Sequence, residues 1–479
     1  MSDKQLYIRY HKWTRDEFRR LAKSLNEIMS MSSFQFYMPL FSLYFYIHNT
    51  SRSHQTIDFE RRYYLQEWLD TTKERYYNSN LLGNALIYDS GRHLSEIKPI
   101  FCKMIPILDP IHCINNNYNL ISNHNHYLPS GYNYNTFNKI NDMNNNAYID
   151  VFCSYLFGQL TQTKKNPSFP LFYGSLNGTG EYKFDITEEY HDLKMDKCFN
   201  ENLGKGFTLD MYVSDSESDD SEIEDIPRSD TESDSSKDDK YHDDYIAIFK
   251  KLPIQLLFIE QLEKTLEDYL ISDEYDEKSL IGCLFQVTFA LTYLQRRYQF
   301  THNDLHINNV MFTNTETKYL YYKLNNQYFR IPTNGKIVKI IDFGRAIFTF
   351  KNKRYMNDVF SRNGEAGGQY SYPHQVSFLD HGDSEWKPNY HFDLCRLSMT
   401  ILEEIQQDKT SEETLDFLKT MCMDRQNKSF CDMKDDFSLY VAIARNACQS
   451  LPREILEHPI FKQFRISKKH FPRKSYYGL

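Results

Sequence analysis

Two short polar segments, each joined to an apolar run, constrain the fold of this chain more than any other feature. Residues 301–309 read T-H-N-D-L-H-I-N-N and are followed at once by the apolar residues 310–312. A second apolar run, 337–341, ends at Asp342-Phe343-Gly344. A short apolar run bounded by polar residues is consistent with a buried strand. We therefore predict two strands whose adjoining loops present their side chains to a common site.

The residue types in these loops are those that phosphoryl transfer requires. One carboxylate must lie beside the attacking hydroxyl, while amide and carboxylate oxygens hold Mg²⁺ against the phosphates. Asp304 is the predicted base, and Asn309 and Asp342 are the predicted metal ligands. The alternative is that the two carboxylates only cap turns. The presence of both segments in this order makes that interpretation the weaker one.

At these residues the chain resembles the protein kinase superfamily, whose patterns are H-R-D-x-K-x-x-N and D-F-G. It departs from them at Asn303, which stands where Arg is common, and at His306, which replaces Lys. The Arg normally receives an activation-loop phosphate, so the resemblance implies activity that is not controlled in that way. Because that Lys neutralises the transferred phosphate, the resemblance implies that His306 contacts the transferred group. A His neutralises a phosphate only when protonated, or donates to it when neutral. The pattern H-x-D-L-H-x-x-N also resembles haspin-type kinases and several small-molecule kinases.

The resemblance implies an α+β, bilobal kinase-like fold that uses ATP and Mg²⁺. We expect a helical extension over 1–80, a β-rich small lobe over 81–260 and a helical large lobe over 261–479. Within the extension, a capping box at Thr14 predicts one helix, and a second helix is predicted over 59–77. The small lobe would carry two insertions, which are Asn-rich at 111–147 and acidic, serine-rich and disordered at 213–244.

The small lobe offers candidates for nucleotide binding. Lys103 lies in the middle of the apolar run 99–106, where a lone cation is explained if it reaches the phosphates; the alternative is an edge-strand Lys in water. Asp150 is the only acid on the predicted helix 148–161 and is the candidate partner of Lys103, although kinases usually place a Glu there. Glu260 and Leu262 would join the lobes, where backbone groups can pair with an adenine edge.

Two features of the small lobe favour a non-catalytic pseudokinase instead. Only one glycine, Gly83, lies in the segment 83–88 that is predicted to cover the nucleotide, so a backbone phosphate cradle is poorly supported. Phe101 stands two residues before Lys103, where kinases place a small residue beside the adenine. The joint presence of the three loop residues Asp304, Asn309 and Asp342 argues for catalysis.

Later segments extend the resemblance and open the question of substrate. Aromatic runs on either side of Asn325-Asn326 predict a hairpin over 319–336. With this inserted hairpin the chain resembles the serine/threonine kinases of giant DNA viruses. Asp393 matches the buried aspartate that holds the catalytic loop in kinases. The segment 342–388 lacks the A-P-E triplet of ordinary kinases. We therefore expect a serine/threonine protein kinase with an unidentified protein substrate, and keep a small-molecule kinase as the alternative.

Charge, cysteine content and hydropathy limit the remaining classes. The net charge is −9, and residues 214–244, with 14 acidic and 3 basic residues, carry a net charge of −11. The rest of the chain is therefore nearly neutral, and no large basic face suggests a nucleic-acid partner. The most apolar run, 34–47, is too short to cross a bilayer. Nine scattered cysteines suit a reducing compartment. We expect a soluble intracellular protein, in host cytoplasm or a virion if the viral resemblance holds. The oligomeric state is not predicted.

Overall fold

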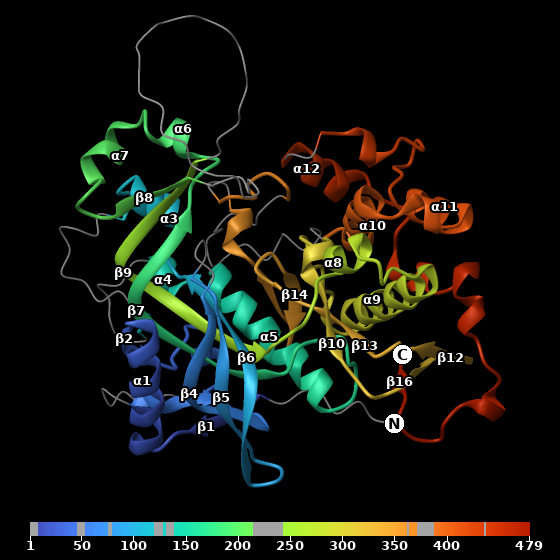
Figure 1. The fold of residues 1–479 in the computed structure, drawn as a ribbon, viewed down its shortest axis with the longest axis horizontal. Coiled ribbons are helices and arrows are strands. Elements are labelled where there is room, and N and C mark those ends of the chain that lie inside the picture. Colours follow the sequence, from blue (N-terminus) through green and yellow to red (C-terminus); the bar gives the residue numbers. More distant parts are fainter. Residues whose placement is uncertain are drawn as a thin grey trace, which may run out of the picture.

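The computed structural model describes residues 8–45, 53–74, 79–118, 128–130, 138–213, 243–361, 364–370, 388–434 and 437–479. The chain is mixed α+β, as predicted. In Figure 1 a curved sheet lies on the left, the C-terminal helices gather on the right, and α5 (Asn146–Gln162) lies between them. The acidic run 214–242 and residues 119–127 and 131–137 of the Asn-rich segment lie outside the described residues.

The sheet is antiparallel and has seven strands. Its order is β2-β7-β9-β6-β5-β4, and β8 also pairs with β9. The strands are β2 (Ser32–Gln35), β4 (Tyr63–Glu74), β5 (Leu81–Asp89), β6 (Leu94–Pro106), β7 (Phe172–Asp185), β8 (Thr208–Val213) and β9 (Asp243–Glu260). The long strand β9 ends at Glu260, where the chain leaves the sheet for the helical region.

The second helix predicted near the N-terminus is wrong. Residues 57–74 instead form β3 (Ile57–Phe59), which pairs with β1 (Tyr10–Lys12), and β4, which pairs with β5. Irregularities interrupt the register of β4 at three places. Each bulge shifts the two-residue alternation by one position, so Tyr64, Leu65 and Trp68 are all buried and imitate a helical spacing. The expected boundary at residue 81 falls between two paired strands.

The first N-terminal helix forms as predicted, whereas Gly83 does not lie in a covering turn. Thr14 and Glu17 make the capping box of α1 (Arg15–Met29). Gly83 lies inside β5, where a Cβ atom would come within 2.1 Å of the Asp70 carbonyl oxygen and 2.7 Å of the Trp68 ring. This glycine therefore makes room for packing between β4 and β5.

The helical region is built around one long, buried helix. This is α9 (Glu277–Tyr298), which Asp276 caps and which ends at Gln299 in the left-handed conformation. Residues on all sides of α9 are buried, as expected for a helix that is apolar around most of its circumference. The other helices here are α8 (Leu266–Ile271), α10 (Phe392–Glu404), α11 (Glu412–Met421), α12 (Phe437–Asn446) and α13 (Pro452–Ile455).

Small antiparallel sheets carry the two polar loops. Strand β10 (Val310–Asn314) pairs with β13 (Lys336–Ile340), so the ends of both loops meet at one place. The predicted hairpin is confirmed as β11 (Tyr319–Leu324) and β12 (Gln327–Pro332). A further hairpin, β14 (Ile347–Phe350) and β15 (Lys353–Met356), follows the second loop.

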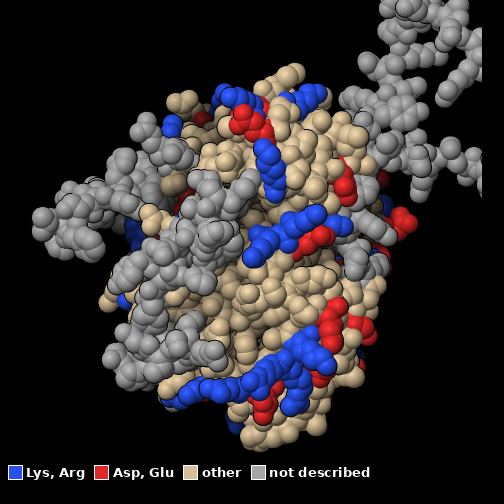
Figure 2. Space-filling model, turned by 90° about the vertical axis from the view of Figure 1, so that its left-hand side faces the viewer, with Lys and Arg blue, Asp and Glu red and all other residues tan. Residues whose placement is uncertain are grey.

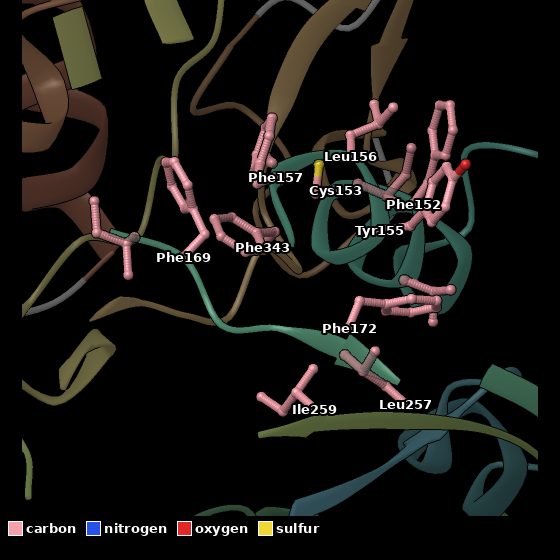
Figure 3. Close-up of a cluster of buried hydrophobic side chains, with 14 of the residues drawn as sticks. Phe152, Cys153, Tyr155, Leu156, Phe157, Phe169, Phe172, Leu257, Ile259 and Phe343 are labelled. Carbon is pink, nitrogen blue, oxygen red and sulfur yellow. The ribbon is translucent and has the colours of Figure 1, made fainter. Parts of the chain in front are cut away.

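Helix α5 connects the sheet to the second loop through aromatic packing. Phe343 lies among side chains of α5 and the segment before β7 (Figure 3), with ring centroids 5.1 Å from Phe157 and 6.4 Å from Phe169. Phe343 is 1% exposed. Because a fully buried aromatic ring contributes a large part of local packing energy, this contact fixes the position of the neighbouring Asp342.

Surface charge, the hydropathy of the helices and the state of the cysteines add three observations. On the face shown in Figure 2, Lys and Arg form bands with Asp and Glu beside them, so neither sign stands alone there. Within the described residues, no helix combines the length and apolarity needed to cross a membrane. All nine cysteines are free thiols.

Candidate active site

A cluster of three charged residues joins the sheet, α5 and the second loop. Lys103 extends from β6, and its Nζ lies 2.7 Å from Asp150 Oδ2 and 2.9 Å from Asp342 Oδ1. Asp150 is 1% exposed, and its Oδ1 also accepts from the Phe343 backbone N–H at 3.1 Å. The predicted contact between Lys103 and Asp150 is therefore present.

The charges in this cluster determine its protonation. Burial alone would raise the pKa of Asp342, but the charge and hydrogen bond of Lys103 lower it to about 2. Burial would lower the pKa of Lys103, whereas Asp150 and Asp342 together raise it. The ammonium group and the Asp342 carboxylate are thus both charged at neutral pH, and the Asp342 side chain is still 42% exposed. An exposed carboxylate held in place by a cation can accept a further ligand.

The loop 301–309 and the loop at 342–344 are connected through Asn309. Its Nδ2 donates to the Asp304 backbone oxygen at 2.8 Å, and its own backbone oxygen accepts from Ile341 N–H at 3.1 Å. Asn303 and Asp342 have φ values of 64° and 61°. Such values are uncommon in residues other than glycine and often mark functional sites.

A buried aspartate holds the backbone of the first loop. Asp393, in the first turn of α10, accepts from the backbone N–H groups of His302 and Asn303, both at 2.9 Å. His302 Nε2 lies 2.9 Å from the Ile341 carbonyl oxygen, and its ring centroid is 5.5 Å from that of Phe343. The expectation for Asp393 is confirmed, and the alternative of a simple helix-terminal acid does not account for these two bonds.

Asp304 has partners that sequence reasoning missed. Tyr440 of α12 donates its hydroxyl to Asp304 Oδ1 at 3.1 Å, and Arg345 Nη1 lies 3.8 Å from the same oxygen. Arg345 also pairs with Glu365. Tyr440 is separated from Asp304 by 136 positions in the sequence, and nothing in its local pattern indicates the contact. Arg345, directly after Asp342-Phe343-Gly344, could have been considered from its position.

Residues 261–264, which follow β9, lie beside β10, the strand that follows the loop 301–309. The Glu263 N–H donates to Phe312 of β10 at 2.9 Å, and the Phe312 N–H donates to Lys264 at 2.9 Å. The Glu260 side chain pairs with Lys339 at 2.7 Å, with side-chain exposures of 17% and 5%. Leu262 is half-buried. A charged residue in the middle of the apolar run 337–341 is the sequence signal that could have identified Lys339.

The residues present fit a magnesium ion. The Asn309 amide donates through Nδ2, so its Oδ1 is the atom that could bind a cation, and the Ile341–Asn309 backbone bond joins this loop to the one that carries the ionised Asp342. Mg²⁺ commonly takes only one or two protein oxygens and completes its shell with water and substrate phosphates. His306 does not suit a metal, because its Nε2 lies 3.0 Å from the Asn309 amide nitrogen.

Part of the chain is similar in sequence to serine/threonine-protein kinases. It is 32% identical over 105 residues to haspin of Bos taurus, across 22% of this chain and 12% of that protein. It is 33% identical over 96 residues to a protein of Acanthamoeba polyphaga mimivirus that is named as a serine/threonine-protein kinase, across 18% and 24%. No family model matches the chain. The chain thus spans a quarter or less of these relatives, and the predicted resemblance to protein kinases is confirmed at that level.

Replacing Lys103 by Met should destabilise the protein in a pH-dependent way. An unpaired buried charge costs about 3 to 5 kcal/mol, and Asp150 is left without its cation. Burial raises the pKa of Asp150 above its ordinary value of 3.8, and Lys103 opposes this rise. Without Lys103, Asp150 in the folded state therefore takes up a proton at a higher pH than Asp150 in the unfolded chain. The loss of stability should therefore be larger at pH 7 than at pH 5.

Urea unfolding at both pH values measures this difference. Lys98→Met, on the same strand with a side chain that is 30% exposed, is the matched control and should change the unfolding free energy by about 0.5 kcal/mol or less. An equal loss at pH 7 and pH 5 for Lys103→Met would show that Asp150 does not carry the uncompensated charge.

Proposed function

We propose that this chain is an ATP- and Mg²⁺-dependent serine/threonine protein kinase with a bilobal kinase-like fold. The observation that carries the proposal is the joint placement of two systems. Lys103, Asp150 and Asp342 form one ion cluster, and the Asp304 loop is bound to the Asp342 loop through Asn309. In this proposal the sheet forms the small lobe and α8–α13 the large lobe, joined near Glu260 and Leu262.

Each residue would have one physical task. Lys103 would hold the nucleotide phosphates, while Asn309 and Asp342 would hold Mg²⁺, which supplies positive charge against the phosphate oxygens. Asp304 would orient the substrate hydroxyl and accept its proton as the new oxygen–phosphorus bond forms and the bond to the departing ADP breaks. Position matters more than pKa for such a base. Backbone groups near Glu260 and Leu262 would pair with the adenine edge.

One sequence observation favours a small-molecule kinase as a second candidate. The segment after Asp342 lacks the A-P-E triplet that closes the peptide groove of ordinary kinases. A phosphate-transfer assay with radiolabelled ATP separates the candidates when Ser/Thr peptide libraries are compared with alcohols and amino-alcohols. Transfer to peptides supports the proposal, and transfer only to small alcohols supports the second candidate. Nucleotide binding without transfer to any acceptor would support a pseudokinase.

A further inference from the structure

The loop 301–309 has no Lys at the position where kinase loops commonly carry one. That position holds His306, whose ring lies beside two amide groups of the same loop. Nδ1 lies 3.3 Å from the Asn308 backbone N–H, and Nε2 lies 3.0 Å from the Asn309 amide nitrogen. The His306 ring is therefore engaged by groups of its own loop.

A permanent cation lies close by on the neighbouring loop. The Arg345 guanidinium has Nη1 3.8 Å from Asp304 Oδ1, and it lies 5.6 Å from the centre of the Tyr440 ring. Tyr440 donates to that same Oδ1 at 3.1 Å. These two contacts fix one oxygen of Asp304 and place the guanidinium beside the carboxylate that a substrate hydroxyl would approach.

Other cations nearby are less available. Lys103 is engaged by Asp150 and Asp342. Arg396 is 6% exposed and lies against the Tyr440 ring at 5.3 Å. Arg345 is 21% exposed, and its second edge contacts Glu365, whose side chain is 66% exposed. Exposed ion pairs contribute little to stability, so phosphate oxygens can replace Glu365 at small cost.

We infer that Arg345 supplies a fixed positive charge to the transferred phosphoryl group. This inference rests on the proposed function. In phosphoryl transfer, negative charge is spread over three oxygens of the moving group, and fixed cations stabilise it. Arg is always charged and binds phosphate through two parallel donors. Because the attacking hydroxyl would lie within hydrogen-bond distance of Asp304, a guanidinium beside that carboxylate is also beside the phosphorus.

Arg345→Lys and Arg345→Met, which have similar length but differ in charge, test the inference. The Met variant should lose about 100-fold to 1,000-fold in kcat, as for removal of one fixed transition-state donor, with its KM for ATP changed by about threefold or less. The Lys variant keeps the charge but not the two parallel donors, so it should lose activity, though less than the Met variant. Introducing His306→Lys into Arg345→Met should recover at least about tenfold of the lost rate, because it returns a cation to the loop.

The pH profile and one control variant complete the test. Wild-type kcat should not decline between pH 6.5 and 8 through loss of this charge, because Arg stays charged. Arg330→Ala, at an exposed position of β12, should retain wild-type activity. If wild type transfers phosphate and Arg345→Met keeps its kcat, the inference is wrong and the proposed function survives. If wild type transfers no phosphate to any acceptor, the proposed function fails and the inference with it.

Discussion

Asp304→Asn should reduce kcat by about 100-fold to 10,000-fold, the range that a positioned general base contributes. The amide has nearly the shape of the carboxylate and can still accept from Tyr440, so the loop should keep its geometry. It cannot accept the proton of the substrate hydroxyl. Steady-state phosphate transfer at saturating ATP measures the loss once an acceptor has been identified.

The control for this variant is nucleotide binding. Asn309 donates to the Asp304 backbone oxygen, not to its side chain, so binding of ATP with Mg²⁺ should be unchanged in Asp304→Asn. A variant that binds nucleotide normally and retains wild-type kcat would show that Asp304 is not the base. A variant that no longer binds nucleotide would show that the side chain supports the structure of the metal site.

Asp393→Ala should cause a large loss of stability. Asp393 is fully buried, and both of its hydrogen bonds are to backbone N–H groups of the loop 301–309. An orphaned buried donor costs about 1 to 3 kcal/mol, so the two together should lower the unfolding free energy by about 2 to 6 kcal/mol. Thermal and urea unfolding measure the effect.

A matched substitution separates this effect from the loss of any helical aspartate. Asp416 lies at an exposed position of α11, and Asp416→Ala should change stability by about 0.5 kcal/mol or less. Equal melting temperatures for Asp393→Ala and wild type would contradict the conclusion that Asp393 supports the loop 301–309.

The local patterns predicted the site better than the surrounding fold. A local signal marks each of the two loops, Lys103 in its strand, Asp150 on its helix and Asp393. A polar residue within or beside an apolar run indicates a specific role. The strand β4 was missed because its bulges conceal the two-residue alternation. The contacts of Asp304 with Tyr440 and Arg345 were missed because long-range packing sets them, and no local spacing encodes a partner on another helix.

The interpretation of Gly83 shows the same limit. A lone glycine near the start of the predicted small lobe suggested a turn over the nucleotide. The structure places it in the interior of β5, against Trp68 and Asp70. The need for glycine there comes from the neighbouring strand, and the sequence of β5 alone contains no information about that neighbour. The domain limits and the catalytic roles of the site residues remain predictions.

The most direct test of the central claim is a thermal-shift titration of wild type and Asp342→Ala with ATP, with and without Mg²⁺. A ligand at saturation that binds only the folded state should stabilise wild type by about 2 to 4 kcal/mol. We predict a rise in melting temperature that requires Mg²⁺ and that is lost in Asp342→Ala, since Asp342 would hold the metal. No shift of wild type at millimolar ATP, or an equal Mg²⁺-dependent shift in the variant, would contradict a metal–nucleotide site at Asp342.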